Sequence, residues 1–247
     1  MSAWGIVKRA ASEYASNPLR YILLCLPGRA VFSAALWVAI LPSAQRGGAP
    51  FGVALTVSVL SALIAYPITS PPPIASVAYE LIGERGGIGR PFRRTFKVFF
   101  PLLGTFIMWL IFMGIGLALF AFPALLLYVR HCLAPHAVII EGEGGYGAMR
   151  RGKAILEGEF GRGMAVMLFA LFAEVLAGQL IGTALLLLKG AEGFGAGWEY
   201  LILGFILPLL FDPFRALLST ELYLSLRREK EGLTDESFRE EFLEWER

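Results

Sequence analysis

Ionisable residues inside apolar stretches are the part of this sequence whose types and spacing could carry chemistry. Six of them fall near the middle of long hydrophobic runs: Arg29, Arg130, His131, Glu174, Asp212 and Arg215. If these runs cross a bilayer, each formal charge costs roughly 2.5–3.5 kcal/mol unless it meets a partner or water. Asp212 and Arg215 lie three residues apart and can pair on one helix, which leaves Glu174 for Arg29 or Arg130.

This pairing leaves one cation without a carboxylate, and two interpretations remain open. In the first, the six side chains form a structural network that fastens the helices together. In the second, the spare cation and His131 line a cavity that holds an anionic headgroup or solute.

A second group of residues, His131, Cys132 and His136, has the side-chain types of a metal site. Residues five apart on a helix point about 140° away from each other, so the two histidines do not share a face. The next carboxylate along the chain is Glu141. We therefore expect no metal site and no cofactor.

Glycines 142, 144 and 147 match the G-x-G-x-x-G pattern of dinucleotide sites. Fewer than about 25 residues separate the flanking apolar runs, whereas one βαβ unit needs about 30 or more. Glu141 and Glu143 would also repel a pyrophosphate. The pattern therefore predicts a turn at the membrane surface. Since the chain has no nucleophile elbow, HExxH, P-loop or paired catalytic carboxylates, we expect a protein that is not an enzyme.

The composition sets the class of protein that must position these groups. Of 247 residues, 56% are hydrophobic and 17% are charged, whereas a soluble domain has about a quarter charged. The prediction is an all-α, polytopic membrane helical bundle with short cytoplasmic helices. Residues 1–20 form an amphipathic helix on the membrane surface, 21–228 form the membrane domain and 229–247 form an acidic cytoplasmic tail.

The apolar runs predict six transmembrane helices. Their expected ranges are Tyr21–Leu41 (interrupted at Pro27 and Gly28), Phe51–Ser70, Val98–Leu119, Pro123–Ile140, Met164–Leu188 and Tyr200–Leu226. Residues 98–129 would reach about 48 Å as one helix, too long for one span, so we divide them before Pro123. With this division the basic loops all fall on one side, which places both termini and the loops at 85–97 and 141–163 in the cytoplasm.

The cytoplasmic loops carry cations that we expect to contact anionic lipid rather than nucleic acid, because few aromatic residues lie among them. These cations are Arg90, Arg93, Arg94, Lys97, Arg150, Arg151 and Lys153. In the tail, Phe238, Phe242 and Trp245 share one face of a predicted helix. This face docks either on the chain's own basic loops or on a partner protein.

Two stretches carry a resemblance to a known family. The run PALLLYVRHCLAPHAVIIEGEGGYGAMRRGKAILEGEFGRG and the ending ALLSTELYLSLRREKEG resemble motifs of a six-helix prokaryotic membrane-protein family of mostly unknown function. That family is related to the membrane domain of some glycerophosphodiester phosphodiesterases. Ala124 and Gly152 depart from its pattern, which usually has Gly and Ser there. The resemblance implies the fold and a prokaryotic cell (inner) membrane location, and it transfers no catalytic residue.

Two functions are therefore expected. The first is a non-enzymatic membrane protein that acts as a scaffold or subunit of a complex, through its basic loops and acidic tail. The alternative is a transporter or lipid-handling protein with a polar intramembrane cavity for an anionic ligand.

Overall fold

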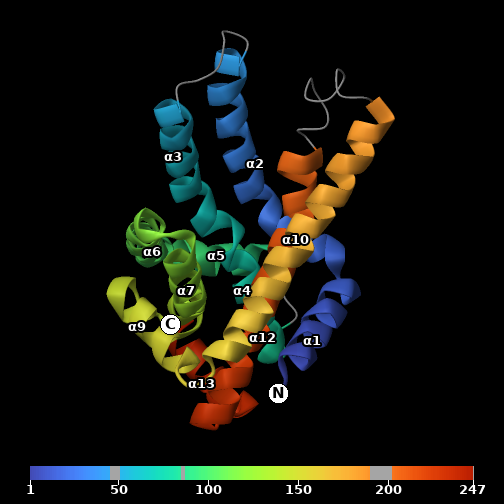
Figure 1. Ribbon diagram of the computed structural model, residues 1–247. Coiled ribbons are helices and arrows are strands. Elements are labelled where there is room, and N and C mark those ends of the chain that lie inside the picture. Colours follow the sequence, from blue (N-terminus) through green and yellow to red (C-terminus); the bar gives the residue numbers. More distant parts are fainter. Residues whose placement is uncertain (45–50, 85–86, 190–201, 247) are drawn as a thin grey trace.

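The computed structural model describes residues 1–44, 51–84, 87–189 and 202–246, and all regular structure in this part of the chain is helical (Figure 1). The predicted all-α class is therefore confirmed. The elements are α1 (Ala3–Ser16), α2 (Pro18–Ala44), α3 (Phe51–Thr69), α4 (Pro71–Leu81), α5 (Gly89–Lys97), α6 (Phe99–Leu119), α7 (Ala121–His131), α8 (Ala134–His136), the π-helical turn η1 (Ala137–Glu141), α9 (Gly145–Leu156), α10 (Phe160–Lys189), the π-helical turn η3 (Ile202–Ile206), α12 (Leu207–Glu231) and α13 (Asp235–Glu246).

Prolines set the boundaries of the first helices. Helix α2 begins at Pro18, and α4 begins at Pro71 directly after α3 ends at Thr69. A proline in a first turn loses nothing, because its missing N–H would have no partner inside the helix. The expected interruption of the first span is wrong, because α2 runs as one helix through Pro27 and Gly28.

The apolar run 98–129 divides at Phe120, so the predicted break in this run is confirmed. Phe120 has an extended backbone between α6 and α7, with φ 178° and ψ 164°. Its N–H donates to the carbonyl of Gly116 at 3.0 Å, and its own carbonyl accepts from the N–H of Ala124 at 3.4 Å. The two helices touch at Gly116, where a Cβ atom would lie 2.9 Å from Cα of Ala124. Helices α6 and α7 therefore form a closed hairpin of apolar residues, the α6–α7 hairpin.

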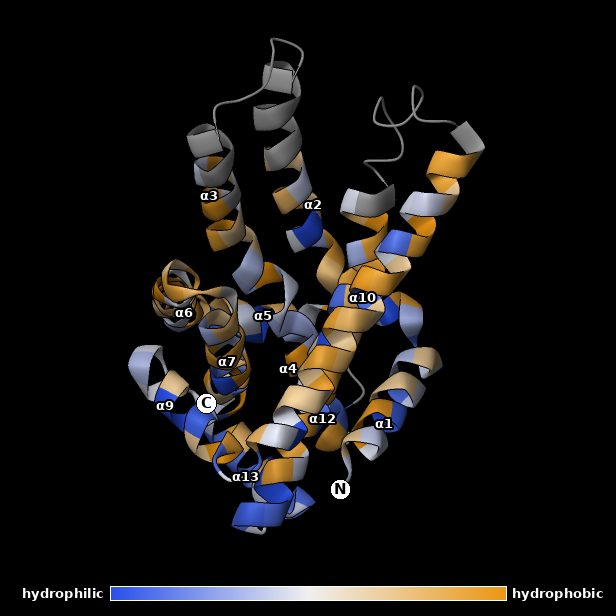
Figure 2. Ribbon diagram, viewed as in Figure 1, coloured by the Kyte–Doolittle hydropathy of each residue, from blue (hydrophilic) through white to orange (hydrophobic). Residues whose placement is uncertain are grey.

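Three segments of the described chain are long and apolar enough to cross a membrane: Phe99–Leu119, Phe122–Glu141 and Phe160–Leu187. They form much of the hydrophobic part of Figure 2. In Figure 1, α6 is seen nearly end-on, whereas α2, α3 and α10 are seen from the side. Helix α6 therefore runs at a steep angle to these three helices.

The packed core lies where α12 meets α4, η1 and α9, away from the far ends of α2, α3 and α10. Ile74, Ile139, Met149 and Leu222 are among its buried side chains. The outer surfaces of α6 and α10 expose large apolar side chains instead, and Phe172 is 67% exposed. Large exposed apolar surfaces of this kind suit a lipid environment.

The two terminal helices cover this core. Helix α1 buries Ile6, Val7 and Ala10 and leaves Trp4 58% exposed. Helix α1 thus packs one face on the core and leaves the ring of Trp4 outside it. Helix α13 buries Phe238 and Phe242 against the rest of the chain, which confirms the expected aromatic face and its docking on the chain's own loops.

Candidate functional site

A cavity of about 340 Å³ lies among α2, α3, α6, α7 and α12, and we refer to it as the central cavity. Charged groups, an aromatic wall and a histidine contribute to its lining. The lining side chains discussed below are Arg29, Tyr66, Phe106, Trp109, Tyr128, His131, His136, Asp212 and Arg215.

A chain of ion pairs crosses the charged side of the central cavity. Arg29 donates from Nε and Nη2 to Oδ2 of Asp212 at 3.0 and 2.6 Å. Arg215 donates from Nη2 to Oδ1 of Asp212 at 3.0 Å and to Oε2 of Glu174 at 2.8 Å. Helices α2, α10 and α12 are thereby joined by two cations and two carboxylates, whose formal charges cancel.

Close helix packing positions Arg29. Helices α2 and α3 approach each other at Gly28, where a Cβ atom would lie 2.7 Å from the backbone nitrogen of Thr69. Only glycine permits this approach. The next residue, Arg29, then reaches across to Asp212 on α12.

The observed pairing differs from the expected one. Asp212 and Arg215 do pair, but Glu174 contacts Arg215 rather than Arg29 or Arg130, because Arg215 lies between both carboxylates. Arg130 is exposed and lines a different recess. His131 does line the central cavity and stacks on Phe112 with ring centres 5.7 Å apart. The expected spare cation is therefore not at this site.

Aromatic rings form the opposite wall of the central cavity. Tyr66 stacks on Phe106 at 4.0 Å, Phe106 stacks on Trp109 at 5.7 Å, and Trp109 meets Tyr128 at 6.3 Å. These four residues come from α3, α6 and α7. The sequence did not predict this wall, because only the i, i+3 spacing of Phe106 and Trp109 could have indicated it.

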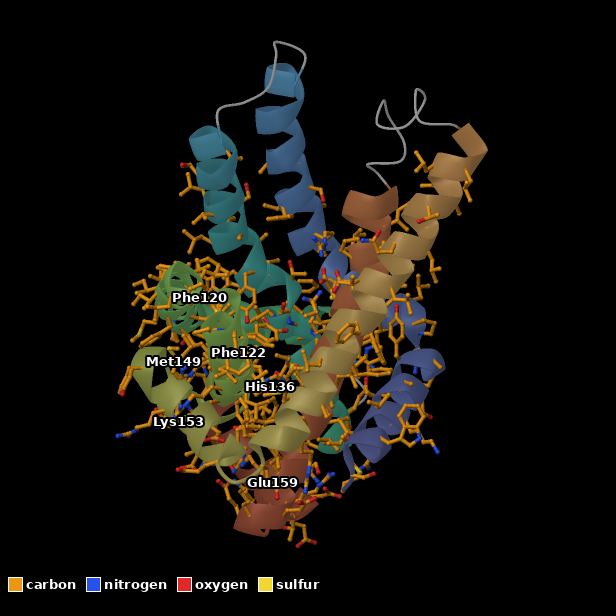
Figure 3. All side chains as sticks on the ribbon, viewed as in Figure 1. Phe120, Phe122, His136, Met149, Lys153 and Glu159 are labelled. Atoms are coloured by element: carbon orange, nitrogen blue, oxygen red, sulfur yellow. The ribbon has the colours of Figure 1, made fainter. Side chains whose placement is uncertain are left out.

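His136 adds a polar group to the lining, and Figure 3 shows it in the interior among the helices. It is 1% exposed, and its Nε2 lies 3.2 Å from Oγ1 of Thr220. The hydroxyl of Thr220 also donates to the carbonyl of Ala216 at 2.7 Å. Nδ1 of His136 is buried, with no hydrogen-bond partner among the described residues.

His136 and His131 do not join a metal site in this structure. Among the described residues, no group of three or more His, Cys, Asp or Glu side chains is arranged to hold a metal ion. His136 instead stacks on Tyr223 with ring centres 5.3 Å apart.

The structure separates the seven expected lipid contacts into paired and unpaired cations. Arg94 is only 2% exposed, donates to the carbonyl of Ile139 at 2.9 and 3.1 Å, and lies between the rings of Phe242 and Trp245. It therefore fastens α13 and does not face lipid. Lys97 lies over the ring of Trp245 at 5.5 Å.

Two more of these cations have carboxylate partners. Arg90 pairs with Glu84, and Arg151 contacts Glu141 at 2.6 Å and Glu231 at 2.6 Å. Arg93, Arg150 and Lys153 are exposed, and the structure gives them no ion pair with a described residue. Three of the seven expected lipid contacts therefore have no carboxylate partner among the described residues.

A network of ion pairs, which we call the α12–α13 network, joins the end of α12 to α9 and α13. Glu231 accepts from Arg151 and from Arg227 at 2.8 Å, and Arg227 also binds Glu241 at 2.8 Å. Burial raises the pKa of Glu231, but the hydrogen bonds from these two arginines outweigh it and hold the pKa below its usual value. Glu231 is therefore ionised in the folded protein at neutral pH.

These features define an all-helical protein with membrane-length apolar helices and an internal cavity that combines ion pairs with an aromatic wall. Comparisons of this chain with family models, curated proteins and solved structures give no match. The resemblance to the six-helix prokaryotic family stays a prediction.

Proposed function

We propose that this chain is an integral membrane protein that binds an amphipathic ligand in the central cavity. The observation that carries this proposal is the juxtaposition of Arg29, Asp212 and Arg215 with the aromatic wall in one cavity. Pockets of about 300–1,000 Å³ with apolar walls and a few polar groups are typical of small-molecule sites. Ionisable groups inside a membrane domain also mark ligand pathways by default.

The charge balance narrows the class of ligand. Because two carboxylates neutralise Arg29 and Arg215, the cavity does not favour the bare anion that the sequence suggested. A neutral or zwitterionic polar head exchanges hydrogen bonds with the ion pairs, while the apolar part of the ligand packs on Trp109 and Phe106. We therefore propose lipid handling rather than anion transport.

The scaffold function ranks second. It depended on basic loops and an acidic tail that were free to recruit a partner protein. In the structure these features contact each other, since Arg94, Lys97 and Arg227 hold α13 in place. They therefore supply no argument for a partner of their own.

The membrane topology is part of the same proposal. The cations favour a prokaryotic cell membrane with both termini and the basic loops in the cytoplasm. Two arrangements satisfy this distribution. In the first arrangement, six helices cross the membrane. In the second, four helices cross it, and the α6–α7 hairpin enters the membrane from the cytoplasmic side and returns to the same side.

Contacts of the hairpin favour the second arrangement. Arg130 on α7 lines the same recess as Lys153 of the basic helix α9, and the N–H of Gly145 donates to Oγ1 of Thr105 on α6 at 2.9 Å. The eleven residues from Phe120 to Arg130 rise only about 15 Å as a helix, which is half of a hydrocarbon core of about 30 Å. We therefore place the apolar hairpin tip inside the bilayer.

The ligand can be tested by what co-purifies with the full chain. Mass spectrometry of molecules extracted from protein in a mild detergent should show a ligand with wild type and with Phe172→Ala, which removes an exposed ring on α10. Trp109→Ala should lose it while keeping its helix content. Equal ligand content in both variants would overturn the proposal, and a stable protein partner of wild type would favour the scaffold function.

A further inference from the structure

A second recess lies between the end of α7 and the turn that joins α9 to α10, and we call it the α7–α9 recess. Its volume is about 240 Å³. Its lining residues are Arg130, Lys153, Leu156, Glu157, Gly158 and Phe160. It shares no lining residue with the central cavity, so it requires its own explanation.

The two cations of this recess differ from neighbouring arginines because no described carboxylate forms an ion pair with them. Arg130 and Lys153 are exposed and form no ion pair with any described residue, whereas nearby Arg151 and Arg162 each bind carboxylates. Glu157 also lines the recess, but it forms no ion pair with either cation within the described residues. The recess thus carries two positive charges against one negative charge.

Its apolar side and its position indicate what it can hold. Leu156 is buried and Phe160 is half-buried beside the two cations, and Figure 3 shows Lys153 directed outward from α9. Guanidinium and ammonium groups donate charge-assisted hydrogen bonds to phosphate oxygens. Basic pockets at the cytoplasmic membrane surface bind anionic headgroups in this way.

We propose that the α7–α9 recess binds the phosphate of an anionic phospholipid from the cytoplasmic leaflet. Arg130 and Lys153 contact the phosphate, and Phe160 packs against the start of an acyl chain. The proposal rests on the membrane topology given above but not on the ligand of the central cavity. A bound lipid here also anchors the base of the α6–α7 hairpin at the membrane surface.

The test is a native mass spectrometry titration of the delipidated full chain with phosphatidylglycerol. R130Q combined with K153Q removes the charge-assisted hydrogen bonds to the phosphate, so it should weaken binding by at least about tenfold. R239Q removes an exposed cation on α13, outside the recess and outside the expected lipid contacts, and it should bind as wild type does. Phosphatidylcholine should bind more weakly than phosphatidylglycerol.

Three outcomes would overturn this site. They are equal affinities for the double variant and R239Q, equal affinities for the two lipids, or displacement of the lipid by an equal concentration of inorganic phosphate, which would make the recess a free-phosphate site. Trp109→Ala separates the two proposals. It should lose the cavity ligand and keep phosphatidylglycerol binding, whereas the double variant should do the opposite.

Discussion

At the scale of single residues, Asp212 decides whether the ion pairs in the central cavity are balanced. It accepts hydrogen bonds from Arg29 and Arg215, so Asp212→Asn leaves two cations with Glu174 alone. An uncompensated charge in the membrane interior costs about 2.5–3.5 kcal/mol. We expect Asp212→Asn to destabilise the protein by about this amount in thermal unfolding measured in lipid bicelles.

A double variant provides the control for this prediction. Arg29→Gln combined with Asp212→Asn removes one charge of each sign, so it should be more stable than Asp212→Asn alone. With the single variant Arg29→Gln measured as well, the four stabilities give the coupling energy between the two side chains. If Asp212→Asn alone is as stable as wild type, these charged groups are solvated by water rather than paired with each other.

Glu231 makes the α12–α13 network sensitive to acid. Its pKa is lowered in the folded protein from an ordinary value of 4.5, since hydrogen bonds from Arg151 and Arg227 outweigh the effect of burial. A lowered folded pKa gives stability that is present above pH 4.5 and is lost as the pH falls through the folded pKa. The melting temperature of wild type should therefore approach that of Glu231→Gln below pH 4.5.

The matched control for this carboxylate is Glu236→Gln on α13, an exposed position without an ion pair to a described residue. Its melting temperature should differ little from that of wild type at pH 7. A pH-independent difference for Glu231→Gln would contradict the assigned hydrogen bonds.

At the scale of elements, the α6–α7 hairpin separates the two membrane arrangements. Its tip exposes Leu119, Phe120 and Phe122 at 61%, 79% and 67%, and Figure 3 shows both phenylalanines beside α7. In a cysteine-free background, a cysteine at position 120 should resist a membrane-impermeant maleimide from both sides and react only after detergent is added. A hairpin that crosses the membrane would instead expose position 120 to reagent outside the cell.

Two further positions calibrate the labelling. A cysteine at position 153 should react only when the reagent reaches the cytoplasm, and one at position 47, in the expected external loop, should react in intact cells. Rapid external labelling at position 120, equal to that at 47, would restore six full crossings.

Helix α13 is held by a contact that a single methyl group can remove. Gly142 has φ +77°, and a Cβ atom there would lie 1.5 Å from Nε1 of Trp245. Gly142→Ala should therefore release α13, which limited proteolysis of the C-terminal helix detects. Gly158 has a similar φ of +79° with open space around it. Gly158→Ala therefore adds backbone strain of about 1–2 kcal/mol but no steric clash.

This pair of glycines isolates the effect of Trp245. Faster cleavage of α13 in Gly142→Ala than in Gly158→Ala is the expected result. Equal cleavage in both would show that strain at positive φ, rather than the tryptophan, limits the docking.

At the scale of the whole molecule, local patterns predicted what depends on local chemistry. The all-α class, the break at Phe120, the boundary at Pro71 and the aromatic face of α13 followed from run lengths, prolines and helical periodicity. Which carboxylate pairs with which arginine could not be predicted in this way. Glu174 could not be assigned to Arg215 from sequence, because pairing depends on how α10 and α12 are rotated against each other.

The positions of Arg130 and of the aromatic wall were missed for related reasons. Hydropathy placed Arg130 at the middle of a span because a continuous apolar run was read as one straight crossing, whereas α7 ends one residue later and packs beside α9. The wall combines Tyr66, Phe106 and Tyr128 from three separate apolar runs. In such runs an aromatic residue that faces a cavity has the same pattern as one that faces lipid.

The division of the molecule into a packed base and a looser membrane half predicts uneven local stability. Buried residues run almost without interruption from Ala216 to Arg227 on α12, whereas α10 exposes Leu176, Leu180 and Leu187. Amide exchange in detergent should therefore be slowest in the packed part of α12 and fastest toward the end of α10, because exchange follows local opening and exposed helices open with little loss of packing.

The same measurement reports on the central cavity. Restoring the co-purified ligand to delipidated protein should slow exchange in α3 and α7, which carry Tyr66 and Tyr128, and should leave α13 unchanged, because binding stabilises the elements that it contacts. The protection should disappear in Trp109→Ala. Equal protection of α13 would mean that the ligand acts on the whole fold, and the central cavity would then not be its site.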